Sequence, residues 1–275
     1  MKVLVLGGAG YIGSHICKML SHYSHKSVVV DNLSTGHRDA VRWSHFIEAD
    51  ILKPGALVRI LQDLIMHFCA KSLVGESVQK PALYYRNNVV GTLNLLDAMV
   101  ETGHDKLVFS STAAVFGMPE KDEIDEQHPR FPINPYGQSK KMIEDVLGDY
   151  HEAYRIKSVA LRYFNACGAD PEGDIGERHE PETHLIPNIL KSATAGKTTL
   201  LKVFGDNYPT PDGTCIRDYI HVNDLASAHI LAGEYLQTHA GAFAFNLGNG
   251  DGFSVFEVIK AAAKVIGQNI AYTIE

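Results

Sequence analysis

The chain has 275 residues, 45% of them hydrophobic, and a formal net charge of -7 at pH 7. This length allows one large domain or two modest domains with a sizeable core. The negative charge, without a run of basic residues, argues against binding to nucleic acid or to an anionic membrane, so we expect a small-molecule or protein partner.

The cysteines and the N-terminal residues indicate where the protein works. The four cysteines are far apart and form no C-x-x-C pair, so the sequence predicts neither a zinc site nor a redox dithiol. We expect no bound metal, and free thiols in a reducing compartment. The apolar run "VLVL" ends at a glycine and is too short for a signal peptide or a membrane span. A soluble, cytoplasmic protein is therefore expected.

Apolar segments alternate with helical patterns along the first part of the chain. Residues 2–23 predict a short strand, a glycine turn and a helix, and two further helical patterns cover 55–63 and 87–103. More strands are predicted at 26–32, 45–51, 64–70, 106–111 and 158–165. Strands that are apolar on both faces and alternate with helices form parallel sheets covered on both sides, so the sequence predicts an α/β fold, a Rossmann-like doubly wound parallel sheet.

After about Asn165 the sequence changes character. Loops rich in Pro, Gly and Asp, at 166–184 and 205–215, flank one helical stretch at 185–196. Loops of this length usually bind something. We therefore expect a nucleotide-binding domain of residues 1–165 and a smaller C-terminal substrate-binding lobe of residues 166–275, some of whose strands return to the sheet.

Two places suggest that the sequence is incomplete. The helical pattern at 55–63 runs directly into the strand at 64–70, without the loop that such a connection normally takes. The chain also stops inside a predicted strand at 268–275. We interpret both as positions where residues are missing.

A glycine motif follows the first strand. Gly7, Gly10 and Gly13 lie between a predicted strand and a predicted helix, the context of a dinucleotide fingerprint rather than of a simple tight turn. Eighteen residues after the last of them, Asp31 ends the second strand, where a carboxylate would bind a ribose 2'-hydroxyl and repel a 2'-phosphate. The motif predicts a site for NAD rather than NADP.

Other residues at the ends of the strands are less specific. Asp50 and Ile51 follow the third strand, where the carboxylate either faces the adenine amino group or caps the next helix. His67, near the end of the fourth strand, has no partner at metal-ligand spacing, and we interpret it as a satisfied strand histidine.

Tyr136 and Lys140 are four residues apart in a predicted helix, so they share one face. A surface pair is the simplest interpretation, but the hydroxyls Ser110, Ser111 and Thr112 end the fifth strand at the same sheet edge. Lowering a tyrosine pKa from about 10 to near 7 requires roughly 4 kcal/mol. An ammonium about 6 Å away supplies on the order of 2.8 kcal/mol, and a cationic nicotinamide ring would supply most of the rest. A phenolate base near neutral pH is therefore expected.

These segments resemble a known family. "GGAGYIG", "SSTAAVFG" and "PYGQSK" together resemble the extended short-chain dehydrogenase/reductase family. "HFCAKSLVGESVQKP", "LRYFNACGADPEGDIGE" and "PTPDGTCIRDYIHVNDLA" are more specifically similar to its UDP-glucose 4-epimerase branch, and the resemblance covers nearly the whole chain.

The resemblance implies an isomerase that inverts C4 of a UDP-hexose, interconverting UDP-glucose and UDP-galactose through a 4-keto sugar with tightly bound NAD. Tyr136 would take the proton from the sugar 4-hydroxyl, Thr112 would hydrogen-bond that hydroxyl, and Lys140 would hold the nicotinamide ribose and lower the phenol pKa. Helices at 88–103 and 138–153 would pair with their copies in a homodimer.

The resemblance also assigns the remaining site residues. The expected cofactor-binding residues are Gly7, Gly10, Tyr11, Ile12, Gly13, Asp31, Asn32, Asp50, Ile51, Phe68, Cys69, Ala70, Asn87, Ser110, Tyr136, Lys140, Tyr163 and Phe164. The expected substrate-binding residues are Thr112, Asn165, Leu185, Phe204 and Arg217. Lys71 is left out, because the cofactor-contacting lysine of the family commonly stands one place later, where this chain has Ser72. For Leu185 and Phe204, packing is the alternative.

Other functions remain open. Nucleotide-sugar 4,6-dehydratases and UDP-glucuronate decarboxylases share the fold and the Tyr/Lys pair, but they carry acidic residues after the active-site Thr, where this chain has Ala113 and Ala114. A non-catalytic or impaired NAD-binding module is the other alternative.

Overall fold

The computed structural model describes residues 1–121, 123–194 and 200–275. Its centre is a seven-stranded sheet with the order β10-β6-β5-β4-β1-β2-β3, in which all neighbouring strands are parallel. The strands are β1 Lys2–Leu6, β2 Lys26–Asp31, β3 His45–Glu48, β4 Leu64–His67, β5 Lys106–Ser110, β6 Lys157–Tyr163 and β10 Ala242–Leu247. The order reverses between β1 and β4, which is where doubly wound sheets bind their ligands.

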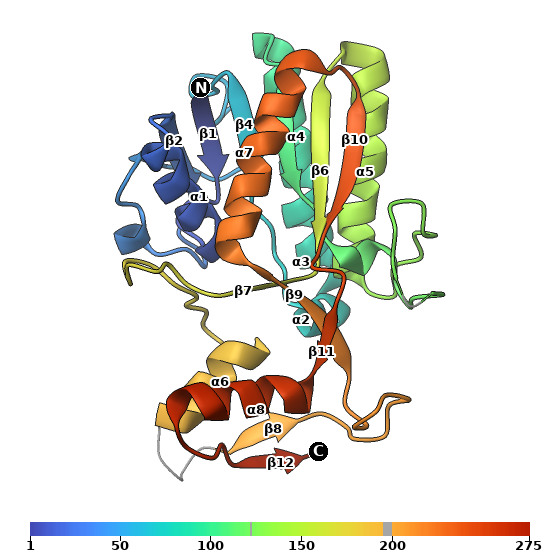
Figure 1. The fold of residues 1–275 in the computed structure, drawn as a ribbon. Helices are drawn as coiled ribbons and strands as arrows, with labels where there is room; N and C mark the ends of the chain where they lie inside the picture. Colours follow the sequence, from blue (N-terminus) through green and yellow to red (C-terminus); the bar gives the residue numbers. More distant parts are fainter. Residues whose placement is uncertain (122, 195–199) are drawn as a thin grey trace.

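Helices cover both faces of this sheet (Figure 1). On one face, α1 (Tyr11–His22) packs beside α7 (Val222–Thr238), and their buried side chains join the inner residues of β1, β4 and β6 in one core. On the other face, α4 (Gly91–Thr102) and α5 (Pro135–Tyr154) enclose a second core. A strand buried on both sides needs apolar residues at every position, so these strands are apolar throughout instead of alternating. The predicted doubly wound α/β fold is confirmed.

Short helical segments connect these layers. Before α4 come α2 (Val74–Gln79), α3 (Pro81–Tyr84) and the π-helix η2 (Tyr85–Val90). Two 3-10 turns, η1 (Arg38–Ala40) and η3 (Ala113–Val115), follow β2 and β5. Both turns therefore lie near the carboxyl edge of the sheet.

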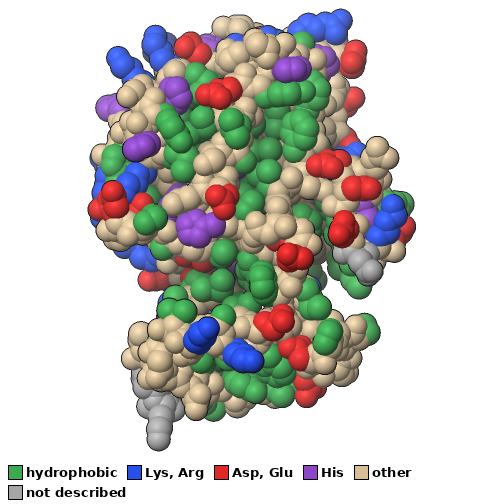
Figure 2. Space-filling view, in the orientation of Figure 1, with side chains coloured by type: hydrophobic (Ala, Val, Ile, Leu, Met, Phe, Trp, Pro, Cys, Tyr) green, Lys and Arg blue, Asp and Glu red, His purple; other side chains and the backbone are tan. Residues whose placement is uncertain are grey.

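A smaller lobe lies below the sheet and is joined to it by a narrow waist (Figure 2). It contains a three-stranded sheet of order β11-β9-β7 and a two-stranded sheet of β12 and β8. Its elements are β7 Asn165–Cys167, α6 Leu185–Thr194, β8 Leu201–Val203, β9 Ile216–His221, β11 Gly252–Ser254, α8 Val255–Ile266 and β12 Tyr272–Ile274. A core of apolar side chains from α6, α8, β8 and the residues before β12 holds the lobe together.

The chain enters this lobe twice. Between the two visits, α7 and β10 return to the large sheet, where β10 pairs with β6 along its length. The predicted segment 166–275 thus contributes both to the lobe and to the edge of the central sheet.

The helix predicted at 55–63 is wrong. This segment forms consecutive turns, in which Ile60 N–H donates to the Leu57 carbonyl at 3.0 Å and Gly55 has a φ of +73°. The apolar residues of the pattern are nevertheless buried as an amphipathic segment requires, because Leu57 and Leu61 lie in the core under α4. A helix ending at Asp63 leaves no residues to turn back into a strand that begins at Leu64, so the turns bury the same side chains in a shorter space.

Other boundaries shift slightly. β3 and β4 end before the predicted limits of residues 51 and 70, because the chain turns at the sheet edge. The helical pattern at 185–196 becomes α6, and its last two residues lie outside the described part of the chain. Among the described residues, no helix combines the length and the apolar character needed to cross a bilayer.

Candidate active site

The glycine motif forms a close turn between β1 and α1. Gly7 has a φ of +81°, and a Cβ there would lie 2.8 Å from the Phe68 carbonyl carbon. A Cβ on Gly13 would lie 2.4 Å from the Gly7 carbonyl oxygen, so only glycine lets α1 start this close to the strand. Gly10 is the N-cap of α1 and carries no side chain over the first free N–H groups. This cradle fits the pyrophosphate of a dinucleotide.

Asp31 is built into the same turn. It is buried at the end of β2, and its two carboxylate oxygens accept hydrogen bonds from Ala9 N–H at 3.1 Å and Leu33 N–H at 2.8 Å. Burial raises the pKa of this carboxyl above its ordinary value, while the backbone donors act in the opposite direction. Each oxygen keeps a lone pair that a ribose hydroxyl could use.

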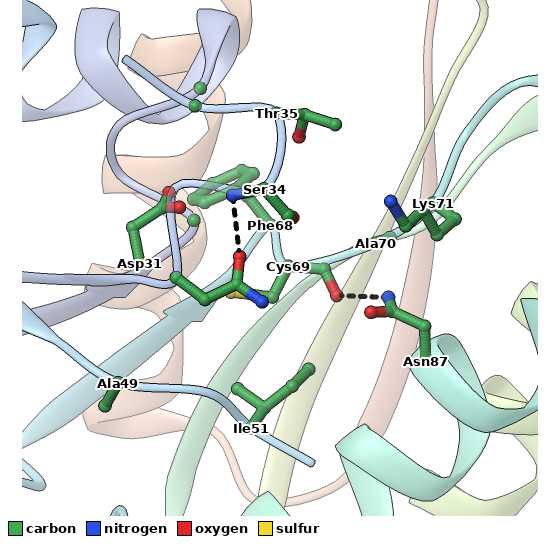
Figure 3. Close-up of a pocket in the computed structure, with 14 residues that line it drawn as sticks. Asp31, Ser34, Thr35, Ala49, Ile51, Phe68, Cys69, Ala70, Lys71 and Asn87 are labelled. Carbon is green, nitrogen blue, oxygen red and sulfur yellow. Dashed lines mark hydrogen bonds between the residues drawn. The ribbon is translucent and has the colours of Figure 1, made fainter. Parts of the chain in front are cut away.

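A cleft opens beside the glycine turn (Figure 3). Half of the predicted cofactor residues line it: Gly7, Gly10, Asp31, Asn32, Ile51, Phe68, Cys69, Ala70 and Asn87. They come from the ends of β1, β2 and β4, the segment after β3, and η2, and Asn87 reaches the Cys69 carbonyl at 3.4 Å.

The cleft also contains residues that the sequence did not predict. Ser34, Thr35, Gly36 and Lys71 line it. Ser34, Thr35 and Gly36 could have been predicted to line the cleft, because they follow the end of β2 at the carboxyl edge of the sheet. Lys71 was left out because of an expected one-residue offset, but in this structure it lies at the cleft (Figure 3).

Two expected cofactor residues have other partners. Asp50 accepts hydrogen bonds from Leu52 N–H at 2.8 Å and from the Asn32 amide at 3.2 Å. Of the two alternatives for Asp50, the structure favours the local cap, which closes a turn rather than a helix. Tyr11 donates to the Gly168 carbonyl at 2.5 Å and so joins the glycine turn to the loop after β7. It lines a second hollow, next to the first, together with Gly176 and Glu177.

The Tyr/Lys pair lies on the first turns of α5. Asn134 caps this helix by accepting from Gly137 N–H at 2.8 Å, and Pro135 occupies its first position. A Cβ on Gly137 would lie 2.4 Å from the Ala114 carbonyl oxygen, so the glycine brings α5 against the segment after Thr112. The helix start and the end of β5 therefore meet at one edge of the sheet.

Lys140 is a buried ammonium and not half of a surface pair. Its side chain is 2% exposed, and Nζ donates to the Ser110 carbonyl at 2.6 Å and lies 4.6 Å from the centre of the Phe109 ring. Thr112 is also buried, and its hydroxyl accepts from Ala114 N–H at 3.1 Å. The Ser110 hydroxyl is hydrogen-bonded to the phenol of Tyr163.

The electrostatics differ from the expectation. Burial raises the pKa of Tyr136 above its ordinary value, and the Thr112 hydroxyl only partly offsets this. Burial also lowers the pKa of Lys140 to about 7, against the attraction of Glu144. The spacing of the two residues predicted their Coulomb attraction but not the loss of water around both groups. The protein groups by themselves therefore do not lower the phenol pKa.

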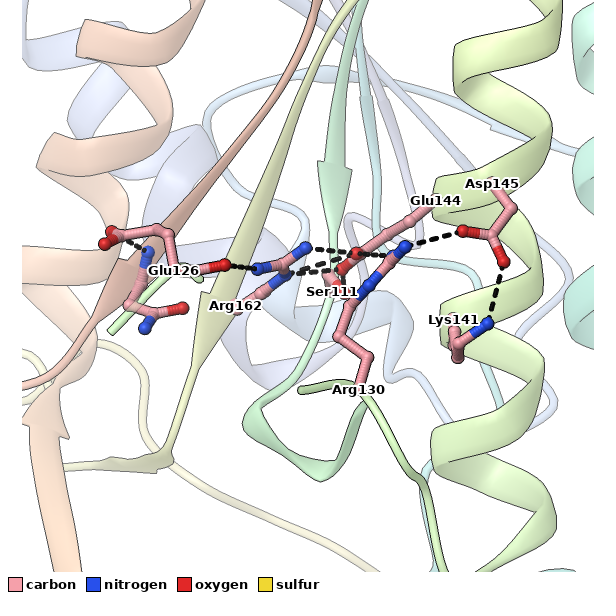
Figure 4. A network of polar contacts seen from close by, with 8 residues as sticks. Ser111, Glu126, Arg130, Lys141, Glu144, Asp145 and Arg162 are labelled. Carbon is pink, nitrogen blue, oxygen red and sulfur yellow. Dashed lines mark hydrogen bonds and ion pairs between the residues drawn. The ribbon is translucent and has the colours of Figure 1, made fainter. Parts of the chain in front are cut away.

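Ser111, the middle hydroxyl of the predicted group, has a different role. It donates to the carboxylate of Glu144 at 2.5 Å, within a network of arginines and acids (Figure 4). His67 is satisfied as predicted, since Nε2 lies 2.9 Å from the Thr92 hydroxyl and Nδ1 accepts from Cys69 N–H at 3.3 Å. Burial lowers the pKa of His67 to about 3, so it stays neutral.

The expected substrate residues are spread over the lobe. Asn165 on β7 donates to the Asp218 carbonyl at 2.8 Å, so it lies beside β9, which carries Arg217. Arg217 is exposed and donates to the neighbouring Ile216 carbonyl. Leu185 packs partly into the lobe core, whereas Phe204, at the end of β8, is 71% exposed. Packing in the lobe core therefore explains part of the apolar surface of Leu185, but little of that of Phe204.

Two groups of ligating side chains occur in the described residues. In one group, Lys18 Nζ lies within 2.7–2.8 Å of three carboxylates and takes the position of a cation: Asp170, Glu172 and Asp174. In the other group, imidazoles lie between carboxylates: Glu177, His179, Glu182 and His184. His184 Nδ1 is 2.7 Å from Glu177, and this contact raises the pKa of His184. The first group is therefore explained as ion pairs to Lys18, whereas in the second group His179 Nδ1 and Glu182 Oε2 are buried without a hydrogen-bond partner.

The doubly wound sheet, the glycine cradle and the Tyr/Lys/Thr group define a dinucleotide-dependent enzyme. The chain belongs to the NAD dependent epimerase/dehydratase family, which it matches over residues 3–248.

Its relatives are more specific. A UDP-glucose 4-epimerase of Rhizobium leguminosarum bv. trifolii is 50% identical over 267 residues, which cover 96% of this chain and 81% of the relative. A structure of UDP-glucose 4-epimerase from Brucella ovis in complex with NAD is 50% identical, with a TM-score of 0.96 over 100% of this chain and 85% of the other. UDP-glucose 4-epimerase from Bifidobacterium longum in complex with NAD+ and UDP is 38% identical, with a TM-score of 0.94 over 100% of this chain and 86% of the other.

Proposed function

We infer that the protein is a UDP-glucose 4-epimerase, an isomerase that inverts C4 of a UDP-hexose. The observation that carries this proposal is the meeting of Tyr136, Lys140 and Thr112 at the sheet edge where the dinucleotide cleft opens. Ala113 and Ala114 follow Thr112 in the 3-10 turn η3, so the acidic groups that elimination or decarboxylation would use there are missing.

Tyr136, Thr112 and Lys140 have different roles in the proposed reaction. When NAD is bound, it supplies the acceptor and donor of the C4 hydride. Tyr136 takes the proton of the 4-hydroxyl and returns it after the 4-keto sugar has turned over. Thr112 orients that hydroxyl, and the Lys140 ammonium stabilises the phenolate. Since burial raises the pKa of Tyr136 here, we expect the positive nicotinamide ring to supply the remaining stabilisation of the anion.

For the nucleotide sugar we propose the lobe side of the waist. Asn165 and Arg217 lie on neighbouring strands, and the exposed guanidinium of Arg217 is suited to pairing with a phosphate. Leu185 and Phe204 lie farther along the lobe and are proposed to contact the uridine. The sugar would then reach across the waist toward Tyr136.

We also propose that the protein is a cytoplasmic homodimer. α4 and α5 lie next to each other, and the Tyr150 phenol donates to Asp97 between them at 2.7 Å. Apolar side chains are exposed on or beside both helices, including Val90, Val100 and Met142. Two such helices from each subunit would cover these side chains in a four-helix bundle. Sedimentation at micromolar concentration should show a dimer, and a monomer alone would contradict the proposal.

The test is direct. Purified protein should equilibrate UDP-galactose and UDP-glucose without added NAD, because the redox change is internal. A 4-keto-6-deoxy product would instead indicate a dehydratase. Bound NAD without turnover would indicate a non-catalytic module, and either result would overturn the proposed function.

A further inference from the structure

A buried carboxylate lies one helical turn beyond Lys140. Glu144 is on the same face of α5 and its side chain is 4% exposed. Arg162 on β6, which is 6% exposed, donates from Nη2 to Glu144 Oε2 at 2.7 Å and from Nε to Oε1 at 3.0 Å. A second guanidinium, that of Arg130, donates to Glu144 Oε2 at 2.9 Å. A two-point arginine clamp of this kind fixes the orientation of the carboxylate as well as its charge.

This network is connected to the reacting groups through Ser111, which Figure 4 shows beside Glu144 and Arg162. The hydroxyl of Ser111 donates to Glu144 Oε1 at 2.5 Å. Ser111 stands between Ser110, whose carbonyl accepts from Lys140, and Thr112, whose hydroxyl interacts with Tyr136. Arg162 directly precedes Tyr163, whose phenol is hydrogen-bonded to the Ser110 hydroxyl. The ends of β5 and β6 and the first turns of α5 are therefore held together by one carboxylate.

We propose that Glu144 is a positioning residue for the epimerase reaction: by holding Ser111, its carboxylate places the Thr112 hydroxyl and the Ser110 carbonyl relative to Tyr136 and Lys140. This inference rests on the proposed function. A misplacement of reacting groups by about 1 Å costs on the order of 100-fold in rate, so loss of this anchor should reduce kcat. The KM for the nucleotide sugar should stay near its normal value, because the residues proposed to bind its uridine and phosphate groups, Asn165, Leu185, Phe204 and Arg217, lie in the lobe.

The carboxylate also acts on the charge of Lys140. Besides the Tyr136 phenol, the titratable groups that interact with the Lys140 ammonium are Glu144 on its own helix and, from β4 and the segment after it, His67 and Cys69. His67 is neutral, and burial raises the pKa of the Cys69 thiol. Glu144 is therefore the anion of this set. Its removal should favour the neutral amine of Lys140, weaken the phenolate and move the acidic limb of the kcat profile to higher pH.

The experiment measures kcat, KM, bound NAD and thermal unfolding of the full chain with UDP-galactose, for the wild type and three variants. Glu144→Gln should lower kcat about 10- to 100-fold. Ser111→Ala removes only the hydroxyl and leaves both arginine pairs, and should lower kcat less, by at most about tenfold. Asp145→Asn is the matched control, since Asp145 is the next residue on α5, is 45% exposed and pairs with Arg130 and Lys141. It should stay within about twofold of wild type.

The proposal is supported if kcat falls while the KM and the amount of bound NAD stay unchanged, and if the acidic limb of the pH profile of kcat moves to higher pH in Glu144→Gln. It is overturned if Glu144→Gln and Ser111→Ala keep the wild-type kcat and pH profile, or if Asp145→Asn loses as much activity as Glu144→Gln. If Glu144→Gln does not fold, Ser111→Ala decides: a loss of kcat at an unchanged unfolding midpoint supports the proposal, and wild-type kcat overturns it. Absence of turnover in the wild-type chain would refute the proposed function and this inference with it.

Discussion

The third glycine of the cradle offers the sharpest test of the cofactor site. In Gly13→Ala, the new Cβ would lie 2.4 Å from the Gly7 carbonyl oxygen and 2.8 Å from Gly8 Cα, both of them backbone atoms. Because such carbon–oxygen contacts start near 3.3 Å, the beginning of α1 must move back by about 0.9 Å. Overpacking of this kind costs about 1–3 kcal/mol.

That cost should appear mainly in NAD binding. The N-terminus of α1 is the part that binds the pyrophosphate, so a retreat of the helix weakens the contacts that the site depends on. We expect the Kd for NAD, measured by calorimetry on protein freed of cofactor, to rise on the order of 10- to 100-fold. Thermal unfolding of the same samples reports the direct effect on stability.

Gly148→Ala serves as the control. Gly148 is inside α5, and a Cβ there meets no described atom within 4 Å. Alanine in a helix interior is about 0.5–1 kcal/mol better than glycine, so this variant should be slightly more stable and bind NAD normally. If Gly13→Ala bound NAD as tightly as wild type, the assignment of this turn to the pyrophosphate would be refuted.

Three more outcomes are expected. Tyr136→Phe should lower kcat about 10²- to 10⁴-fold with NAD still bound, and turnover near the wild-type rate would remove Tyr136 as the acid–base group. Asp31→Ala should narrow the preference for NAD over NADP in direct binding measurements, since it removes the charge that repels a 2'-phosphate. The raised pKa of His184 gives stability that is present below its ordinary value near 6.5 and is lost as the pH rises through the folded-state pKa. The thermal midpoint of wild type should therefore fall toward that of His184→Gln as the pH rises above 6.5, and parallel curves would contradict this.

Features that depend on local sequence were predictable. The glycine cradle, Asp31 at the end of β2 and the helix that carries Tyr136 and Lys140 each depend on short spacings in the chain. The parallel sheet also followed from its uniformly apolar strands. These features are set by sterics and by helix periodicity, which a sequence displays directly.

Features that depend on tertiary context were not predictable. The periodicity of 55–63 counts apolar side chains, but the lack of space before β4 turns that segment into successive turns. The attraction between Tyr136 and Lys140 could be worked out from their spacing, whereas the burial that opposes it depends on the elements packed around them. The partner of Ser111 is Glu144, 33 residues away, which no local pattern identifies.

The return of the chain to the sheet has a consequence for folding. β10 is the edge strand beside β6, and α7 packs on α1, yet both elements follow the first passage through the lobe. A fragment that stopped at residue 165 would leave the hydrogen-bonding groups of β6 unpaired on one side and the apolar side of α1 uncovered. We therefore expect the dinucleotide half not to fold as an autonomous unit. Proteolytic or genetic separation of the two halves should yield an aggregating product rather than a minimal NAD-binding protein.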